Sequence, residues 1–262
     1  SLSDTELGLL SGSSLTIGNS SNGTVTVTGV TSLNTPLTLN ATSSGSAVNF
    51  KTTASSGLEN LTINAGTGGV DFDVDVTTTG SLTVNSGSAI SGAGILTVAD
   101  SMSINTTGNS NAIIASNSVV TLGASAVGGN LQVTAGGDST INVNGAIQTE
   151  GNTTLLADDD IIFTLEGDIT TTSGNIVVTA DNDSDNNGSG GAITMDQGSN
   201  FSTGTGNLTL SADEDITLGL LSTSNFSTSS ITLTSTNGGV RDSDTSSLDI
   251  ITSGRLVADL AT

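Results

Sequence analysis

The sequence predicts an all-β protein, a right-handed parallel β-helix (β-solenoid) of about 11–12 coils. Three observations predict it: short runs of alternating apolar residues, turn-forming clusters between these runs, and recurrence of the unit every 20–24 residues. Right-handedness follows from the strong preference of crossovers between parallel strands.

The strands are expected where apolar and polar residues alternate with period two. Val, Ile, Leu and Thr dominate these runs, which is typical of half-buried strands. Between the runs lie clusters of Gly, Asn, Asp and Ser, which favour turns. In order along the chain the expected strands include 15–17, 24–28, 37–39, 61–63, 82–84, 131–133, 176–178, 208–210 and 231–233.

Aligning these runs indicates the repeat. A polar insertion at about 181–191 separates two of the units, and without it the longest interval, 32 residues, also falls to about 21. The aligned pairs are Leu39 with Leu61 (22 residues), Leu61 with Leu82 (21), Leu131 with Leu155 (24), Leu155 with Ile176 (21), Ile176 with Leu208 (32) and Leu208 with Ile231 (23).

A unit of this length, with two or three short strands, matches one coil of a solenoid. Coils stack at ~4.8 Å, so residues 1–262 are expected to form one continuous rod of roughly 55 Å. Leu, Ile and Val would form the core, while Asn and Thr at matching turn positions would pair with their copies one coil away. A β-sandwich ranks second, because it would show more Tyr or Trp and less regular spacing.

The charge and residue inventory excludes several function classes. With 3 basic and 25 acidic residues the net charge is -22, so neither nucleic acid nor an anionic membrane surface is expected as a partner. No apolar run is long enough to insert into a membrane, and a soluble mature product or excerpt is expected. The chain has no His and no Cys, which removes the usual transition-metal ligands and any Ser–His–Asp triad. Enzyme activity is therefore not expected.

One segment suggests a calcium site. Asp181, Asp183 and Asp185 alternate with polar residues and can present oxygen ligands to Ca²⁺, as the first half of an EF-hand loop does. The glycine comes two positions late, at Gly188, and the twelfth position is Ala192 instead of Glu. The alternative is a solvated loop between coils. No other cofactor is expected.

Other acidic turns and the basic residues have simpler interpretations. The turns 158–160 and 213–215 are expected in neighbouring repeats, where their carboxylates either splay into water or bind a bridging cation. Arg241 lies beside Asp242 and Asp244 and is expected to pair with these acidic neighbours in its turn.

Threonine and phenylalanine raise two further questions. Thr-x-Thr at 24–28 and 232–236 is similar to the rows of ice-binding solenoids, but it does not recur in every coil, and strand preference explains it better. The aromatic residues are expected to fill the core; several of them on the surface would instead mark a partner site. They are Phe50, Phe72, Phe163, Phe201 and Phe226.

Longer phrases carry a resemblance to a family. The segments 8–29, 130–149 and 206–240, including NLTLSADEDITLG, resemble the repeat regions of filamentous-haemagglutinin-like exoproteins. These are long bacterial surface adhesins, many of them exported by two-partner secretion, and the resemblance spans nearly the whole chain. It implies a parallel β-helix that serves as a shaft. The scarcity of Lys and Arg disfavours a sulfated-glycan partner.

The sequence therefore predicts a structural or adhesive segment of a secreted or cell-surface bacterial protein, forming a rigid shaft, fibre or biofilm matrix element. The expected partners are further copies of the chain, as a homo-oligomer or end-to-end filament, or a glycan or cell surface bound through side loops such as 181–191. A polysaccharide-active enzyme and an ice-binding solenoid rank below these.

Overall fold

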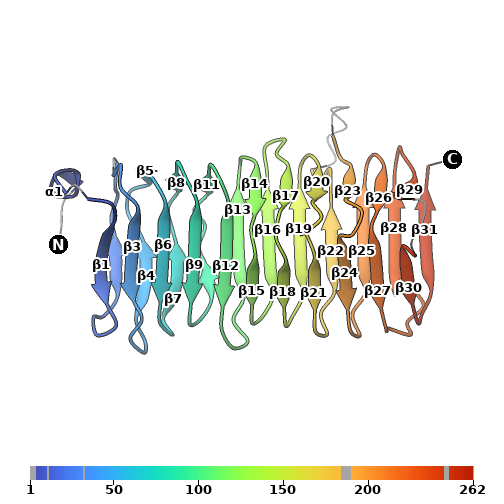
Figure 1. Ribbon diagram of the computed structural model, residues 1–262, viewed down its shortest axis with the longest axis horizontal. Coiled ribbons are helices and arrows are strands. Elements are labelled where there is room, and N and C mark those ends of the chain that lie inside the picture. The colour runs from blue at the N-terminus through green and yellow to red at the C-terminus, as the bar shows by residue number, and fades with distance from the viewer. Residues whose placement is uncertain (1–3, 11, 32, 184–189, 245–247, 262) are drawn as a thin grey trace.

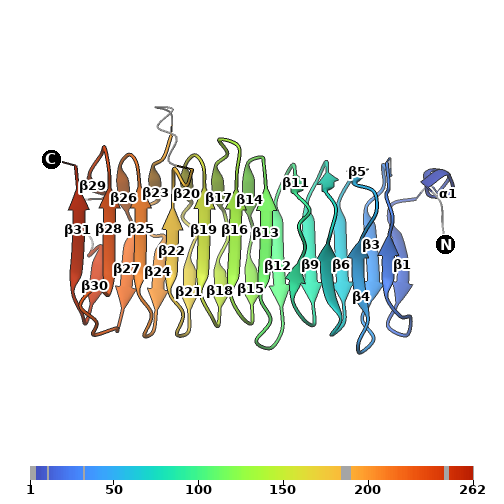
Figure 2. The same cartoon turned by 180° about the vertical axis from the view of Figure 1, so that it is seen from behind.

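The computed structural model is a β-solenoid whose parallel strands stack into a straight rod (Figure 1). It describes residues 4–10, 12–31, 33–183, 190–244 and 248–261. Helix α1 (Asp4–Gly8) lies at one end and strand β31 at the other, and the view from behind shows the same arrangement (Figure 2). The all-β fold class predicted from the sequence is confirmed.

Sheet B contributes one strand to each coil and runs unbroken along the rod. Its eleven strands are all parallel, which gives about 11 coils. They are β2 (Val25–Val27), β4 (Ala47–Phe50), β7 (Gly69–Phe72), β10 (Ile90–Ser91), β13 (Ala112–Ser116), β16 (Leu131–Ala135), β19 (Thr153–Ala157), β22 (Ile176–Thr179), β25 (Leu208–Ala212), β28 (Ile231–Ser235) and β31 (Leu256–Leu260).

Sheet A forms a second wall with seventeen strands. Up to residue 106 each coil gives it one strand: β1 (Leu15–Asn19), β3 (Leu37–Ala41), β6 (Leu61–Ala65), β9 (Leu82–Ser86) and β12 (Met102–Thr106). Beyond that, each coil gives it two. The first set is β14 (Val120–Leu122), β17 (Ile141–Val143), β20 (Ile161–Phe163), β23 (Ile193–Met195), β26 (Ile216–Leu218) and β29 (Val240–Asp242). The second set is β15 (Ser125–Val127), β18 (Ile147–Thr149), β21 (Ile169–Thr171), β24 (Asn200–Thr203), β27 (Leu220–Thr223) and β30 (Ile250–Thr252).

The change from one strand to two occurs at β12. Met102 pairs with Leu122 of β14, and Asn105 pairs with Ala126 of β15, so one strand of five residues supports two strands of the next coil. Before this point three coils have a third wall, the small sheet C, formed by β5 (Ser55–Leu58), β8 (Val76–Thr78) and β11 (Leu96–Val98).

The core lies inside the coils along the length of the stack. Within most strands buried and partly exposed residues alternate, as period-two sequences require. Four phenylalanines fill the interior in two contacting pairs: Phe50 stacks on Phe72 with ring centroids 5.2 Å apart, and Phe163 meets Phe201 edge-on at 4.6 Å. Their burial confirms the predicted core role.

Phe226 is the exception to that prediction. Its side chain is 83% exposed. It lies in the long turn 224–230 between β27 and β28, outside the alternating runs that point inward. A partner site was expected to show several exposed aromatic residues, and Phe226 alone does not meet that condition.

The strand runs were predicted correctly, but three of the aligned pairs were wrong by two residues. Leu61 pairs with Leu37 instead of Leu39, and Thr153, not Leu155, pairs with both Leu131 and Ile176. A shift of two residues leaves every side chain on the same face, so the apolar pattern cannot detect it. The pairs Leu61 with Leu82, Ile176 with Leu208 and Leu208 with Ile231 are confirmed.

Hydrogen bonds between asparagine copies one coil apart join the coils, as predicted, but this ladder lies on strands of sheet A and not at the turn positions expected for it. On the outer face of sheet A the amide of Asn64 donates to Asn40 Oδ1 at 2.7 Å, Asn85 donates to Asn64 at 2.9 Å, and Asn105 donates to Asn85 at 3.0 Å. Thr149, inside the corner, bonds within its own turn and not to a copy: its hydroxyl donates to the carbonyl of Gly151 at 2.8 Å.

Candidate functional site

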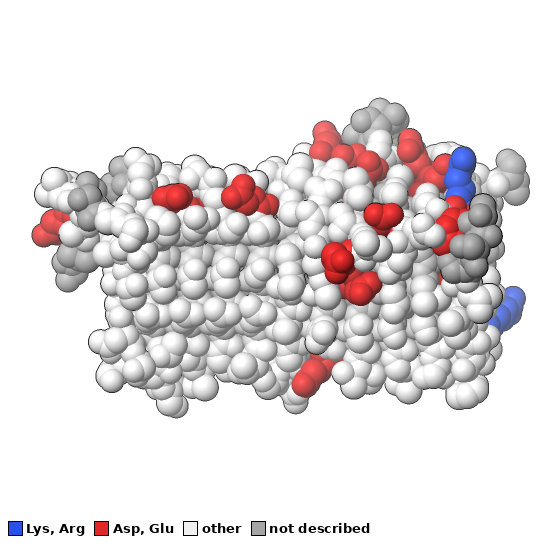
Figure 3. Space-filling model, viewed as in Figure 1, with Lys and Arg blue, Asp and Glu red and all other residues white. Residues whose placement is uncertain are grey.

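The two long edges of the rod differ in charge. In Figure 1 the turns that leave sheet B lie along the upper edge, and those that lead from sheet A to sheet B lie along the lower edge. Figure 3 shows acidic side chains gathered along the upper edge and over part of the adjacent face, with few on the lower edge. We refer to these as the acidic edge and the neutral edge.

On the acidic edge, carboxylates hold the turns of successive coils together. Asp160 Oδ1 accepts a hydrogen bond from the backbone N–H of Ala192 at 2.9 Å, and Asp215 Oδ1 accepts one from Gly239 at 2.9 Å. Asp158 does the same for Gly137, at 2.8 Å. These carboxylates bind the backbone of the adjacent coil, which accounts for much of the acidic turn composition without a ligand.

The turns 158–160 and 213–215 are not in neighbouring coils, contrary to the prediction. Ile161 pairs with Ile193, and Ile193 pairs with Ile216, so the coil containing the 181–191 segment lies between them. The prediction was wrong because the equivalent turn of the intervening coil lies within the long insertion and was not recognised in the sequence.

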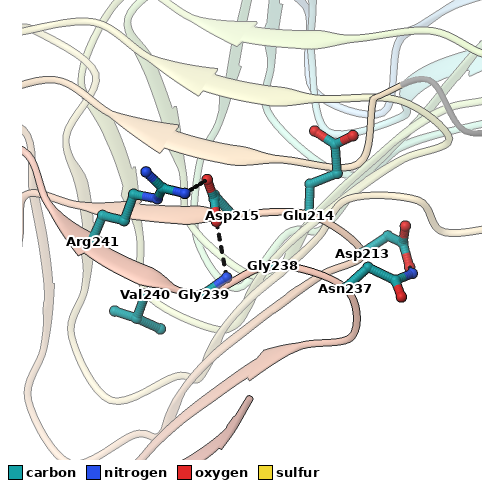
Figure 4. A pocket seen from close by; sticks show the side chains of 8 residues that line it. All are labelled: Asp213, Glu214, Asp215, Asn237, Gly238, Gly239, Val240 and Arg241. Atoms are coloured by element: carbon teal, nitrogen blue, oxygen red, sulfur yellow. Dashed lines mark hydrogen bonds and ion pairs between the residues drawn. The ribbon is translucent and has the colours of Figure 1, made fainter. Parts of the chain in front are cut away.

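A shallow groove of about 620 Å³ lies at the last acidic turn (Figure 4). Arg241 forms an ion pair with Asp215 of the preceding coil, with Nη2 and Oδ2 2.7 Å apart, while Glu214 points away from this pair. The pKa of Asp215 is lowered, first by the hydrogen bond from Gly239 N–H and then by Arg241. Both side chains reach solvent, so the arrangement is a surface ion pair. The sequence predicted such a pair for Arg241, but with the neighbouring acidic residues of its own turn and not with Asp215.

The other ion pairs of the described residues involve Lys51, which contacts Asp71 and Asp73. The hydrogen bond to Asp73 and then that to Asp71 raise the pKa of Lys51, and Lys51 lowers the pKa of Asp73. This cluster is also at the surface, at the end of sheet B strands that reach the acidic edge.

The predicted calcium ligands are only partly described. Asp181 adopts a positive φ of 55° and its N–H donates to the carbonyl of Asp159, while Asp183 is exposed. Asp185 lies outside the described residues. Within the part of the chain that is described, no three acidic side chains come together as a metal-binding group. Calcium binding by Asp181, Asp183 and Asp185 stays a prediction of the sequence.

The neutral edge contains almost no charge. Of its eleven turns, all within the described residues, only two carry a charged side chain, Glu150 and Arg255. These turns are 20–24, 42–46, 66–68, 87–89, 107–111, 128–130, 150–152, 172–175, 204–207, 224–230 and 253–255.

Stacked glycines bring these turns close together. A Cβ at Gly128 would lie 1.7 Å from the carbonyl oxygen of Gly108, and one at Gly174 would lie 2.0 Å from that of Gly151. Any larger residue would push the coils apart. The stacked glycines of these turns therefore carry no side chains that could fill the surface of the neutral edge.

Three adjoining cavities follow the neutral edge and together form a groove. Their volumes are about 430, 370 and 470 Å³; the first two share Thr107, and the second and third share Glu150. One wall is a row of equivalent positions on sheet A, in register from coil to coil. The row is Asn40, Asn64, Asn85, Asn105, Ala126, Gln148 and Thr170.

A second amide ladder runs through the turns of this edge. Asn111, Asn130, Asn152 and Asn175 each accept, through Oδ1, the backbone N–H of the asparagine one coil on, at 2.7–2.8 Å. The sequence predicted pairing between asparagine copies but not which residues form the two ladders, and it did not predict the groove. The recurring Asn in LTLNA, LTINA and LTVNS was the signal that could have identified the first ladder.

The threonine rows remain irregular in the structure. The outward row of sheet B that contains Thr26 and Thr232 is chemically mixed, so no flat threonine array covers this sheet. Its members include Thr26, Asn49, Asp71, Ser91, Ile113, Gln132, Thr154, Val177, Thr209, Thr232 and Val257.

Comparison with protein-family models, curated proteins and solved structures finds no match for this chain. Among the helices of the described residues, none has the length and apolar character needed to cross a membrane. Architecture, charge and the groove are therefore the basis for a functional argument.

Proposed function

We propose that this chain is a rigid shaft element of a secreted or cell-surface bacterial protein. The observation that carries the proposal is the unbroken parallel register of sheet B through all eleven strands. Each coil buries its apolar side chains against the next, so the rod resists bending without a hinge between domains. The resemblance of segments such as 206–240 to filamentous-haemagglutinin-like repeats supports a bacterial surface location.

End-to-end assembly is a second part of this proposal. Adding a coil to the stack uses the same strand pairing that joins the coils already present, so a filament needs no new kind of contact. The net charge of -22 opposes lateral contact between the acidic edges, and a divalent cation would weaken that repulsion.

Negative-stain electron microscopy of the purified chain, in calcium and again in chelator, tests both parts. Straight single rods in both conditions support the shaft, and rods that lengthen into fibres in calcium support assembly. Flexible or bent particles in both conditions would contradict the proposed rigidity.

Removal of one coil provides a sharper test of the shaft. Deleting residues 131–152 removes one step of the repeat, because Leu131 pairs with Thr153. We expect a folded rod shortened by ~4.8 Å, measured by small-angle X-ray scattering. A matched deletion of eleven residues, half a step, should disrupt folding because it joins unlike parts of two coils.

A further inference from the structure

The groove of the neutral edge crosses seven coils, from the position of Asn40 to that of Thr170. Six intervals between coils correspond to roughly 29 Å. The groove is long, shallow and straight, a shape that suits an extended polymer better than a compact small molecule.

The groove walls offer mostly uncharged hydrogen-bonding groups, and Glu150 is the one charged residue that lines the three cavities. In the ladder formed by Asn64, Asn85 and Asn105, each amide uses one of its two N–H groups for the neighbouring coil. The other N–H has no hydrogen-bond partner among the described residues, so each of these three coils can donate once to a ligand. Gln148 and the hydroxyl groups of Thr107 and Thr172 extend this set. Amides and hydroxyls that repeat in this way match the many hydroxyl groups of a polysaccharide.

An exposed aromatic ring lies on the same edge. Phe226 is 83% exposed, whereas the other four phenylalanines are buried. The residues on either side of it are fixed, because Asn225 Nδ2 and Ser227 Oγ donate to Asn207 Oδ1 at 2.7 and 3.1 Å. The loop therefore fixes the backbone on both sides of Phe226 and leaves the ring exposed to solvent, where the C–H face of a sugar can stack on it.

Phe226 lies within reach of an extended polymer that occupies the groove. Its turn follows Ser222, which is in register with Thr170 two coils earlier through Ser202. The ring is thus ~10 Å further along the rod axis than the end of the groove.

We propose that the neutral edge binds an uncharged, extended polysaccharide of the β-1,4-linked type, laid along the rod. The overall charge of -22 repels anionic polymers, and the edge offers no row of cations to bind them. A straight groove requires a straight chain, which β-1,4 linkage provides. Each sugar contributes little, and affinity comes from contacts repeated along the length.

This binding site and the shaft role can be tested separately. Single rods in electron micrographs say nothing about polysaccharide binding, and a variant that loses binding should still form the rod. The occupant that competes with a polysaccharide is a second copy of the chain, joined through the same edge.

Electrophoresis through native gels containing hydroxyethylcellulose tests the proposal, and gels with carboxymethylcellulose supply the same backbone with added carboxylates. We expect the neutral polymer to retard the protein and the anionic polymer to leave its mobility unchanged. Gln148→Glu places a second carboxylate in the groove, in addition to Glu150, and Phe226→Ala removes the ring. Each should weaken retardation by roughly three- to tenfold.

Matched controls lie elsewhere on the rod. Gln132→Glu makes the same change at an exposed position of sheet B, and Leu165→Ala removes an exposed apolar side chain, 56% accessible, that is outside the turns of the neutral edge. Both should be retarded like the native chain, and circular dichroism should show all four variants folded.

Several results would overturn the proposal. These are no retardation of the native chain by hydroxyethylcellulose, equal retardation by both polymers, or retardation unchanged in both Gln148→Glu and Phe226→Ala. Concentration-dependent dimers in sedimentation velocity, lost in Phe226→Ala and accompanied by no retardation, would assign the edge to a second copy.

Discussion

Hydroxyl groups at the inner corners of the coils stabilise the turns through buried hydrogen bonds. Thr171 Oγ1 donates to the carbonyl of Gly174 at 2.7 Å, and Thr223 Oγ1 donates to that of Gly206 at 2.9 Å. Ser199 differs, because its hydroxyl is buried and has no hydrogen-bond partner among the described residues. A partnered hydroxyl stabilises the fold, while an unpartnered one costs the free energy of its lost hydration.

Substitution at these positions should therefore change stability in opposite directions. We expect Ser199→Ala to raise the free energy of unfolding by about 1 kcal/mol. Thr149→Val should lower it by about 1–2 kcal/mol, since it removes the bond to Gly151 and leaves the buried hydroxyl of Thr153 without its neighbour. Urea unfolding followed by circular dichroism measures both. A loss of stability in Ser199→Ala would mean that its hydroxyl has a partner in solution, such as a bound water.

The carboxylate of Asp215 should make stability depend on pH. Its native pKa is lowered from the usual 3.8, so the charged form stabilises the fold at pH above that value. This contribution is lost as the pH falls below about 4 through the lower native pKa. The difference in stability between the native chain and Asp215→Asn should be constant from about pH 5 to 8 and should shrink below about pH 4.

The causes of that lowered pKa can be separated with Arg241→Gln. Because the hydrogen bond from Gly239 N–H is the largest cause and remains in the variant, the pKa of Asp215 should rise only part of the way to 3.8. Titration of the carboxyl carbon by NMR measures this. A full return to the usual value would assign the shift to Arg241 alone.

Among the strands, the paired phenylalanines fix how neighbouring coils pack. Phe163 of β20 and Phe201 of β24 meet inside one part of the core and both are essentially inaccessible. We expect Phe163→Ala to lower the free energy of unfolding by about 3–5 kcal/mol, because the neighbouring strands cannot close the cavity. Phe226→Ala, which changes the same residue type at an exposed position, should leave stability unchanged. Thermal unfolding of the two variants tests this contrast.

The strands and the fold class could be predicted from apolar alternation, because burial in a thin stack requires that pattern. Register could not, since a shift of two residues preserves it. Asparagine decides register where apolar residues do not: aligning Asn40 with Asn64 places Leu37 beside Leu61, as observed. Strand register is therefore predicted better from asparagines that hydrogen-bond to their own copies than from apolar residues, which can pack against several different neighbours.

The candidate sites were predictable to different degrees. The acidic turns were visible as sequence motifs, but their hydrogen bonds to the next coil, such as Asp160 to Ala192, depend on partners 32 residues away. The neutral groove could not be read from any one segment. It arises because turns from separate coils, most of them uncharged, such as 107–111 and 128–130, stack on one edge.

Over the whole molecule, repulsion between acidic side chains should oppose folding. The 25 acidic residues face only 3 basic ones, and the ion pairs of the described residues are exposed and therefore weak. Screening by salt reduces the repulsion, so the melting temperature should rise between about 0.01 M and about 0.5 M NaCl. A fall over the same range would mean that attractive pairs dominate. An uncharged osmolyte, which leaves the Debye length unchanged, should not reproduce the dependence on ionic strength.

Calcium separates general screening from a specific site. At matched ionic strength, calcium and magnesium chloride should raise the melting temperature equally if divalent cations only weaken repulsion along the acidic edge. Binding at Asp181, Asp183 and Asp185 predicts an additional, saturable rise with calcium, because a ligand that binds only the folded state stabilises it. Asp183→Asn should remove that additional rise, whereas Asp100→Asn, elsewhere on the rod, should not. Equal shifts for both cations in the native chain would reject the calcium site and leave screening as the effect of divalent ions on the rod.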